Sequence, residues 1–413
     1  RHILSVAFNV VSQVNKICAG SCGEVKRTAV KIVNRFGMDT FDVIENHPEW
    51  LADIPGITMK KAAYVWDWYL KSVDERDIAV LDIINIAFGK VKDSVLDFDK
   101  PSVPAEIARI HAAKPEMKIL LSVGGWGAGG FSVMCRTAEG IAKFAASCTD
   151  AVEKYGLDGI DLDWEYPTID SAGIDADPSD RENFTLLLQA LRAALDTAYP
   201  DTHKMLTIAA GAGQYYIDGV EIPEITKVLD YISLMTYDMR GAWSPAGHHT
   251  ALYGSPSADE TVRLFNKAGV PVEKLMIGAA FYSRKWTNIP EGGTHGLGQK
   301  CDDPEDRESG MFGPGFSKLA EDYIDKNGYT AFFDEACGAS YLYNETERTF
   351  ISYDDEKSVA AKAEYAEKNG LYPIATTDGL LFASVAEFTE YLYYDIANIF
   401  SLIAAALLVV VMM

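Results

Sequence analysis

Short apolar runs of strand length alternate with amphipathic segments of helix length from Ala62 onward, and this alternation constrains the fold most. The strands that it predicts lie at residues 62–67, 81–88, 118–123, 157–163, 205–210, 231–236 and 275–281. The helices that it predicts lie at residues 103–113, 138–155, 180–198, 223–229 and 258–269. Repeated strand–helix units form a parallel sheet with covering helices. Seven or eight such units in a chain of this length predict an α/β protein with a closed (β/α)8 TIM barrel.

The alternation breaks between about residues 284 and 352, where Gly, Asp, Tyr and Phe are frequent. Short β-like pieces at 328–333, 340–343 and 349–353 predict a small inserted α+β subdomain beside the mouth of the barrel. A helix at 357–368 resumes the alternation, and an atypical eighth strand should follow near residues 370–382. The barrel with its insertion is therefore expected to occupy residues 62–395.

Residues 1–61 are expected to form a helical segment that is separate from the barrel. A helix-like segment at 28–36 is followed by the turn Ile54-Pro55-Gly56-Ile57 and by a basic helix start at Met59. This stretch resembles the helix-hairpin-helix units of RecD-like helicases, in which a glycine hairpin offers backbone N–H groups to a nucleic-acid phosphate. The resemblance covers one short motif, and a helical hairpin without a ligand is the interpretation that we favour.

The other end, residues 396–413, is a hydrophobic tail in which only Asn398 and Ser401 are polar. Its length is at the lower limit of a membrane span, so contact with a membrane is expected only if this tail is an anchor. No clear signal peptide follows Arg1, because Asn9 interrupts the first apolar stretch and no convincing cleavage site ends it.

The net charge of −23 limits the partners expected for the barrel. Acidic residues outnumber basic ones by 60 to 37, which argues against nucleic acid or an anionic membrane surface as the main partner. The six cysteines form no C-x-x-C pair and the histidines do not cluster near them, so no metal site is expected. Cys301 and Cys337 could pair within the insertion, which the sequence does not decide.

The expected strand at 157–163 leads into more carboxylates than a buried strand should tolerate. Side chains alternate between the two faces of a strand, so Asp161, Asp163 and Glu165 share one face. The residues on the other face are Ile160, Leu162, Trp164 and Tyr166. Repulsion and burial raise the pKa values of carboxylates placed in this way, so at least one should hold a proton near neutral pH. Chemistry in (β/α)8 barrels lies at the carboxyl ends of the strands, where Glu165 is found.

Two other strand ends carry candidate binding residues. The Gly-Gly-Trp stretch at 124–126 follows the strand at 118–123, where glycines allow a close approach of the backbone and a tryptophan could stack on a sugar. The strand at 231–236 leads into Tyr237, which shares a face with Met235. A buried tyrosine hydroxyl normally finds a hydrogen-bond partner, and here that partner could be a ligand.

Two short motifs together resemble the signatures of family 18 glycoside hydrolases, the chitinases. They are Asp158-x-x-Asp161-x-Asp163-x-Glu165 and Ser122-x-Gly124-Gly125. Supporting stretches lie at residues 85–89, 180–184, 235–238, 282–284 and 351–355, and the resemblance covers roughly residues 62–370. It implies substrate-assisted hydrolysis of β-1,4-linked N-acetylglucosamine with retention of configuration, without a cofactor.

The resemblance also implies roles for the motif residues. Glu165 would protonate the glycosidic oxygen and then act as a base toward water, while the acetamido oxygen of the substrate is the nucleophile. Asp163 would orient the acetamido group, Asp161 would share a proton or hydrogen bond with Asp163, and Tyr237 would donate to the acetamido oxygen. Asp158 would support the motif structurally. The implied substrate-binding residues are Tyr64, Phe88, Gly125, Trp126, Met235, Asp238, Tyr282 and Arg284.

The chain departs from the pattern of this family in the insertion and toward both ends. The family usually places a tryptophan at the end of strand eight, as the floor of the cleaving subsite, but no tryptophan follows Trp286 here. Phe333-Asp334-Glu335 stands where the family usually has Trp-Asp-Glu. A shift of the reading frame would account for the unfamiliar sequence at both ends.

The favoured function is that of a chitinase, expected to be monomeric and extracellular or at the cell surface, acting on chitin or its oligosaccharides. One alternative is an endo-N-acetylglucosaminidase acting on bacterial wall glycan. A second is a non-catalytic chitin-binding lectin on the same barrel, although such lectins usually lose the acid that is present here as Glu165. A third, nucleic-acid binding through residues 28–63, is opposed by the net charge of −23.

Overall fold

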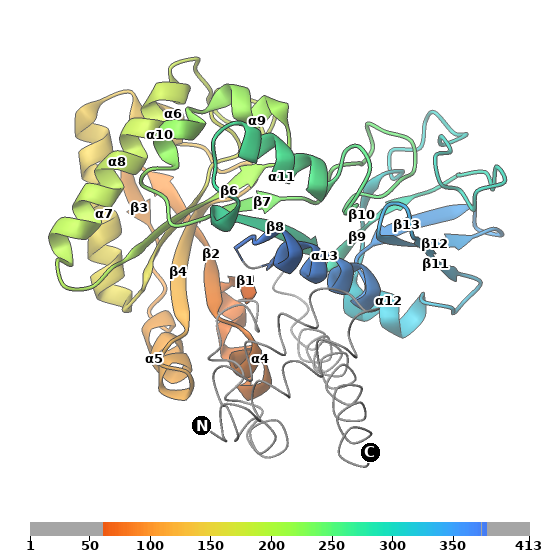
Figure 1. Cartoon of the computed structure of the whole chain (residues 1–413), viewed down its shortest axis with the longest axis horizontal. Coiled ribbons are helices and arrows are strands. Elements are labelled where there is room, and N and C mark those ends of the chain that lie inside the picture. Colours follow the sequence, from red (N-terminus) through yellow and green to blue (C-terminus); the bar gives the residue numbers. More distant parts are fainter. Residues whose placement is uncertain (1–60, 373, 378–413) are drawn as a thin grey trace, which may run out of the picture. The chain divides into compact units, whose positions relative to one another are not determined.

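The computed structural model describes residues 61–372 and 374–377, and every structural statement below concerns these residues (Figure 1). Both the helix-hairpin-helix-like segment and the hydrophobic tail at 396–413 lie outside them. None of the described helices is long and apolar enough to cross a membrane.

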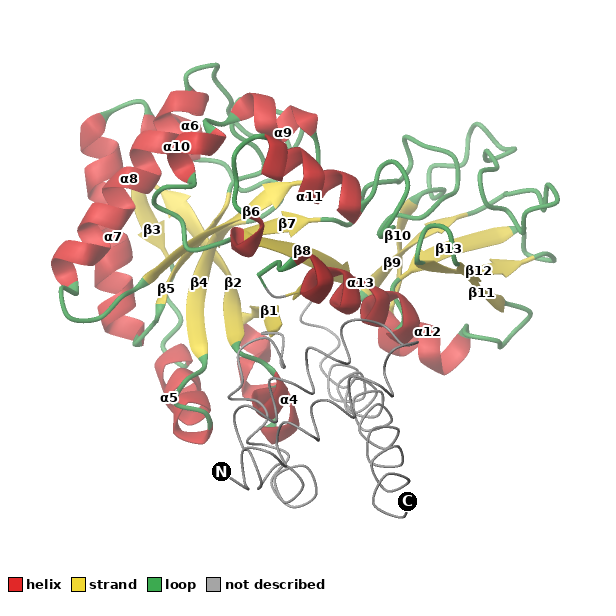
Figure 2. Ribbon diagram, viewed as in Figure 1, coloured by secondary structure: helices red, strands yellow, loops and turns green. Residues whose placement is uncertain are grey.

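Within the described residues, eight parallel strands close into a barrel (Figure 2). Each strand pairs with the next one, and the last strand pairs with both its predecessor and the first, which completes the circle. The α/β class and the (β/α)8 barrel are therefore confirmed, and the eighth strand lies inside the expected segment 370–382. The strands are β1 (Lys61–Trp66), β2 (Ile83–Lys92), β4 (Lys118–Gly124), β5 (Gly159–Asp163), β6 (Met205–Gly211), β7 (Ile232–Met235), β8 (Leu275–Ala280) and β14 (Ile374–Thr377).

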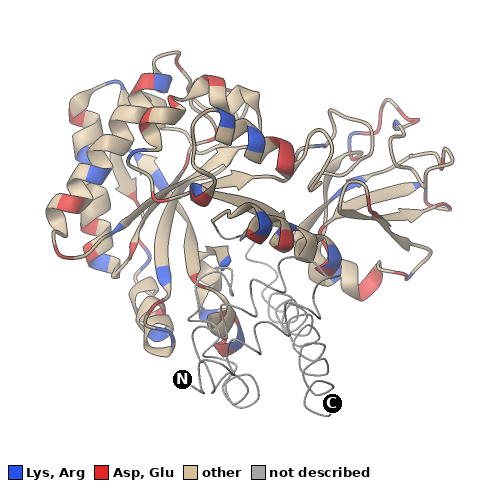
Figure 3. Ribbon diagram, in the orientation of Figure 1, with Lys and Arg blue, Asp and Glu red and all other residues tan. Residues whose placement is uncertain are grey.

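Helices connect successive strands and carry charged residues of both signs (Figure 3). The helix Ala138–Tyr155 shows why they form where they do. Thr137 accepts a hydrogen bond from the N–H of Gly140 at its start, and Gly156 ends it in the left-handed conformation at φ 73°. The main helices are α4 (Glu75–Val80), α5 (Val103–Ala113), α7 (Ala138–Tyr155), α8 (Asp180–Ala198), α11 (Ala258–Lys267) and α13 (Glu356–Asn369).

Several short elements are not predicted from the sequence, because they are too short to show a periodic spacing of apolar residues. The helix expected at 223–229 is only a single turn at Ile222–Ile225. The others are η4 (Asp67–Ser72), β3 (Val95–Asp97), α6 (Phe131–Cys135), α9 (Gln214–Gly219) and η5 (Val272–Lys274). Of these, β3 forms a hairpin with β2.

The insertion follows β8 and forms an antiparallel five-stranded sheet. A cluster that includes Trp286, Tyr341 and Phe350 forms its core. Cys301 and Cys337 are both free, so the disulfide left open by the sequence is not formed. The elements are β9 (Tyr282–Trp286), β10 (Met311–Gly315), α12 (Phe316–Asp322), β11 (Thr330–Asp334), β12 (Ala339–Asn344) and β13 (Thr349–Tyr353).

A buried ion pair joins the insertion to the barrel. Lys362 of α13 and Asp354, which follows β13, are both inaccessible to solvent and lie 2.5 Å apart. The same carboxylate accepts hydrogen bonds from the hydroxyl of Thr250 at 2.8 Å and from the N–H of Ala280 at 2.9 Å. Burial lowers the pKa of Lys362, and the charge of Asp354 opposes that effect.

Replacement of Lys362 by methionine should lower the free energy of unfolding by about 3–5 kcal/mol, since it leaves a buried carboxylate without its cation. The matched control is Lys357→Met on the same helix, whose partner Glu335 is largely exposed. Loss of that pair should lower the free energy of unfolding by less than about 1 kcal/mol. Urea denaturation measures both, and equal midpoints for the two variants would contradict the assigned role of Lys362.

Candidate active site

The end of β4 packs backbone to backbone against the end of β5. Gly124 has φ +126°, and a Cβ there would lie 1.9 Å from the carbonyl oxygen of Asp163. Only glycine fits such an approach. The N–H of Gly125 donates to the same oxygen at 2.8 Å. The two glycines therefore set the position of Asp163.

Asp161 lies in the barrel interior and is inaccessible to solvent. Three hydroxyls donate to its carboxylate: Ser122 at 2.7 Å, Thr207 at 2.6 Å and Tyr64 at 3.1 Å. Burial raises the pKa of Asp161, and the three hydrogen bonds counteract this. Side chains from three other strands thus hold one carboxylate of β5 in place.

Asp163 lies two residues nearer the barrel mouth and is also buried. Its Oδ1 atom is inaccessible and has no hydrogen-bond partner among the described residues. Burial, together with the charges of Glu165 and Asp161, raises its pKa well above the ordinary value, and Lys90 opposes the shift. Asp163 therefore has a buried oxygen without a partner in the described part of the chain and lies beside two other acidic groups, where its ionised form is unfavourable.

Glu165 follows β5 at the mouth of the barrel and is half-buried. Burial and the charge of Asp238 raise its pKa to about 7, against the opposing effects of Tyr166 and Lys90. Because Glu165 and Asp163 influence each other, they titrate as a pair. A carboxyl group with a pKa near 7 can hold a proton at neutral pH and give it up again during a reaction.

β5 ends at Asp163, so the side-chain alternation expected along this segment is not kept by all of the residues that follow. Trp164 points outward as expected and stacks on Phe131, with ring centroids 5.2 Å apart. Tyr166 does not share that outer face, so the expectation for it is wrong. Its ring packs against the apolar cluster in the barrel interior, because the chain is no longer a strand at that point.

The end of β7 supplies a second group of polar residues. Met235 belongs to the interior cluster, and Tyr237 packs against that cluster. Asp238 follows with φ +54° and accepts a hydrogen bond from Nε of Arg284 at 2.7 Å. Burial alone would raise the pKa of Asp238, but hydrogen bonding by His249 and Arg284 lowers it to about 2. Asp238 is therefore a fixed negative charge.

Aromatic side chains follow several strand ends around these carboxylates. Trp66 at the end of β1 lies edge-on to Phe88 of β2, with ring centroids 5.5 Å apart. Trp126, after β4, is 63% exposed and lies edge-on to Tyr166. Exposed rings at strand ends of a barrel suit stacking on a sugar.

A further pair of exposed rings encloses a cation. The guanidinium of Arg284 lies 3.9 Å from the ring centre of Phe312 and 5.7 Å from that of Trp243. Tyr282 lies edge-on to both Tyr237 and Phe312. The insertion therefore adds aromatic and cationic side chains beside Tyr237 and Asp238 through β9 and β10.

Asp158 is separate from these groups, at the amino end of β5. It accepts hydrogen bonds from the N–H of Ile119 at 3.0 Å and from Nζ of Lys118 at 3.3 Å, and its carboxylate lies 3.1 Å from Nε2 of His111. These contacts tie the start of β5 to the start of β4. Of the motif carboxylates, Asp158 is thus the one placed away from the mouth.

Residues 60–375 match the sequence profile of Glycosyl hydrolases family 18. The chain belongs to this family. It is 38% identical over 289 residues to chitinase A1 of Niallia circulans, covering 64% of this chain and 41% of that protein. It is 34% identical over 307 residues to endochitinase 1 of Metarhizium robertsii, covering 70% of this chain and 64% of that protein. The chain therefore spans less than two thirds of these relatives.

Solved structures of family 18 proteins have the same fold. A family 18 N-acetylglucosaminidase from Paenibacillus barengoltzii superposes with a TM-score of 0.76 at 43% identity, covering 80% of this chain and 99% of that one. The cell-surface-expressed, multi-modular chitinase ChiW from Paenibacillus superposes with a TM-score of 0.75 at 35% identity, covering 80% of this chain and 32% of that one.

The aromatic residue nearest to strand eight does not replace the tryptophan that the family usually has there. Tyr372 precedes β14 and stacks on Tyr231, which precedes β7, with ring centroids 4.9 Å apart. Both tyrosines therefore lie at the amino ends of parallel strands, whereas active sites of (β/α)8 barrels lie at the carboxyl ends. The segment that follows β14 is outside the described residues.

Several residues at the mouth were missed by the sequence reasoning, among them Lys90, His249, Trp243 and Phe312. Lys90 donates from Nζ to the carbonyl oxygen of Gly124 at 2.5 Å, and its charge acts on both Asp163 and Glu165. Lys90 lies near the carboxyl end of a strand that pairs with β4. This position could have identified it from the sequence as a candidate site residue. His249 and Trp243 lie in a loop, and Phe312 lies in the short strand β10. Neither segment shows the periodic spacing of apolar residues from which helices and strands are predicted.

Lys90→Met should shift the alkaline limb of the pH–activity profile to higher pH. Removal of a nearby cation makes Glu165 harder to ionise and therefore raises its pKa. Lys90→Arg keeps the charge and should leave the limb in place, as should Lys92→Met, two residues along the same strand. A limb that moves equally in the methionine and arginine variants would exclude an electrostatic role for Lys90. The profile is measured as kcat/KM on a chromogenic chitobiose substrate.

Proposed function

We propose that this chain hydrolyses β-1,4 bonds between N-acetylglucosamine units of chitin or its oligosaccharides by a substrate-assisted, retaining mechanism. The observation that carries the proposal is the pairing of Glu165, whose pKa is near 7, with Asp163, whose buried Oδ1 lacks a partner among the described residues. The first can supply a proton at neutral pH. An oxygen of the second would accept the N–H of an acetamido group once the side chain turns toward the substrate.

In the first step Glu165 donates its proton to the glycosidic oxygen while the acetamido oxygen of the substrate attacks the anomeric carbon. The bond to the leaving sugar breaks, and a cyclic oxazolinium ion forms. Asp163 accepts the acetamido N–H and stabilises the positive charge. Tyr237 donates its hydroxyl to the acetamido oxygen, which orients it for attack.

In the second step the ionised Glu165 takes a proton from water, which attacks the same carbon and opens the oxazolinium ring. Asp161, held by three hydroxyls, supports both steps by sharing a proton or hydrogen bond with Asp163, so that Asp163 can be ionised when the positive charge develops. Asp158 acts only as structural support. The proposed binding surface consists of Tyr64, Phe88, Gly125, Trp126, Met235, Asp238, Tyr282 and Arg284.

The substrate preference is proposed from the relatives. Chitin and its oligosaccharides fit the named chitinases, whereas the 43% identity to an N-acetylglucosaminidase favours N-acetylglucosaminidase action as an alternative. Action on bacterial wall glycan is a further alternative. A non-catalytic lectin is disfavoured because Glu165 is present with a pKa suited to proton transfer.

We also propose that the protein works outside the cell or at its surface, since ChiW is described as cell-surface-expressed. A monomer without a cofactor suffices for the proposed reaction, because the groups named above all belong to one chain. The acidic surface makes nucleic acid an unfavourable partner for the barrel.

Glu165→Gln should reduce kcat on chito-oligosaccharides by about 10²–10⁴-fold, since it removes the proton donor while keeping the shape of the side chain. Binding measured by calorimetry should remain. Glu106→Gln, on the outer helix α5, is the matched control and should keep full activity. Turnover by Glu165→Gln at the rate of the unmodified protein would refute the assignment.

The newly formed reducing end should have the β configuration, because attack by the acetamido oxygen followed by water inverts the anomeric carbon twice. Proton NMR during the first minutes of hydrolysis, before mutarotation, measures this. An α anomer as the first product would rule out the substrate-assisted step and leave the assignment of Glu165 as acid untouched.

A further inference from the structure

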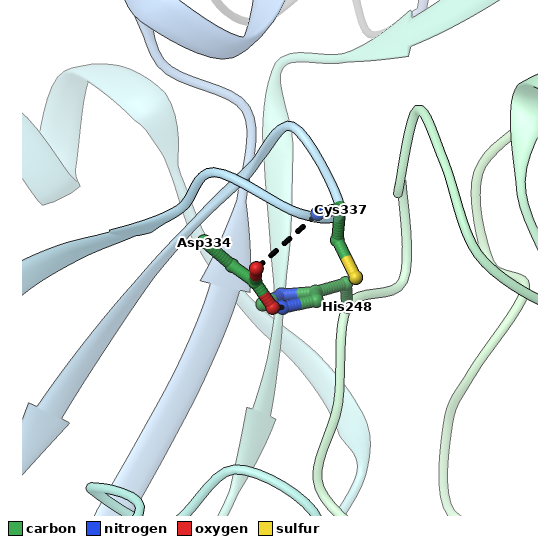
Figure 4. A group of neighbouring side chains, drawn as sticks. All are labelled: His248, Asp334 and Cys337. Carbon is green, nitrogen blue, oxygen red and sulfur yellow. Dashed lines mark hydrogen bonds and ion pairs between the residues drawn. The ribbon is translucent and has the colours of Figure 1, made fainter.

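Three side chains with metal-ligating atoms meet where the loop after β7 touches the insertion (Figure 4). They are His248 from that loop, Asp334 at the end of β11, and Cys337 from the turn between β11 and β12. Their donor atoms all lie within 4.8 Å of one another. Nε2 of His248 lies 3.0 Å from the carboxylate of Asp334.

The surrounding backbone holds this group in place. The carboxylate of Asp334 accepts the N–H of Ala336 at 3.0 Å and that of Cys337 at 3.2 Å. The carbonyl oxygen of Cys337 accepts the N–H of Leu252 at 3.0 Å and that of Tyr253 at 2.9 Å. The turn is therefore fixed against the loop that carries His248, so the three donors are preorganised.

A thiol has to lose its proton when it binds a cation, and Cys337 would release that proton to solvent.

One ring nitrogen of His248 is buried without a partner in the part of the chain that the structure describes, while the other lies against Asp334. His248 is only 6% exposed, and its Nδ1 has no hydrogen-bond partner among the described residues. A buried polar atom without a partner is unfavourable in a folded protein. Asp334 and Cys337 are half-exposed, so an ion can enter from solvent.

We propose that His248, Asp334 and Cys337 bind a divalent cation of the zinc class at the junction between the barrel and the insertion. Nitrogen, oxygen and thiolate sulfur together are typical zinc ligands, and three protein ligands leave one position for water. The sequence hides this group because 86 positions separate His248 from Asp334. The expectation of no metal site rested on spacing along the chain alone.

The test uses cobalt(II) as a spectroscopic substitute for zinc in the full chain. Cys18 and Cys22 are replaced by serine beforehand, since two cysteines so close in the sequence could bind cobalt themselves. One equivalent of cobalt should produce a thiolate-to-cobalt charge-transfer band in the near ultraviolet. Zinc should displace the cobalt and abolish the band.

Cys337→Ser should remove the charge-transfer band and weaken zinc binding by more than about 100-fold. Cys301→Ser, which changes the other half-exposed cysteine of the insertion, should do neither. Asp334→Asn should weaken zinc binding but keep the band. Absence of the band in the parent chain, or its persistence in Cys337→Ser, would overturn the proposal. Hydrolytic activity is not a readout here, so the outcome is independent of the proposed function.

Discussion

The carboxylate of Asp161, buried in the barrel and bonded to three hydroxyls, is the interaction on which the active site depends. Tyr64, Ser122 and Thr207 reach it from β1, β4 and β6, so one side chain of β5 fixes its strand against three others. A buried carboxylate is tolerable only with such partners. Its hydrogen bonds stabilise the ionised form, and that charge acts on the next carboxylate along the strand.

The three carboxylates differ in burial and in hydrogen bonding from the barrel interior to the mouth. Asp161 is fully satisfied, whereas Asp163 keeps a buried oxygen without a partner among the described residues. Glu165 lies beyond the end of the strand, with a pKa of about 7. The proton is therefore favoured at the outer two members, close to where a substrate would lie. The order follows from strand geometry and differing access to hydrogen-bond donors.

Much of this arrangement could be predicted from the sequence, because strand and helix periods are local properties. The barrel, the acidic strand and the glycine pair after β4 are all visible as patterns in the chain. Tyr166 was placed wrongly because alternation stops where β5 stops, and a strand end depends on tertiary contacts. Arg284 was expected at the site from the family resemblance and Lys90 was not, but both act through space on carboxylates of other elements, and no local pattern shows that effect.

The insertion takes part in the electrostatics of the site through Arg284. This residue lies in β9, directly after the barrel strand β8, and its guanidinium is held between Phe312 and Trp243. From there it bonds to Asp238 at 2.7 Å and helps to keep that group ionised. The charge of Asp238 in turn raises the pKa of Glu165. The insertion therefore contributes, together with His249, to the fixed charge of Asp238 that acts on Glu165.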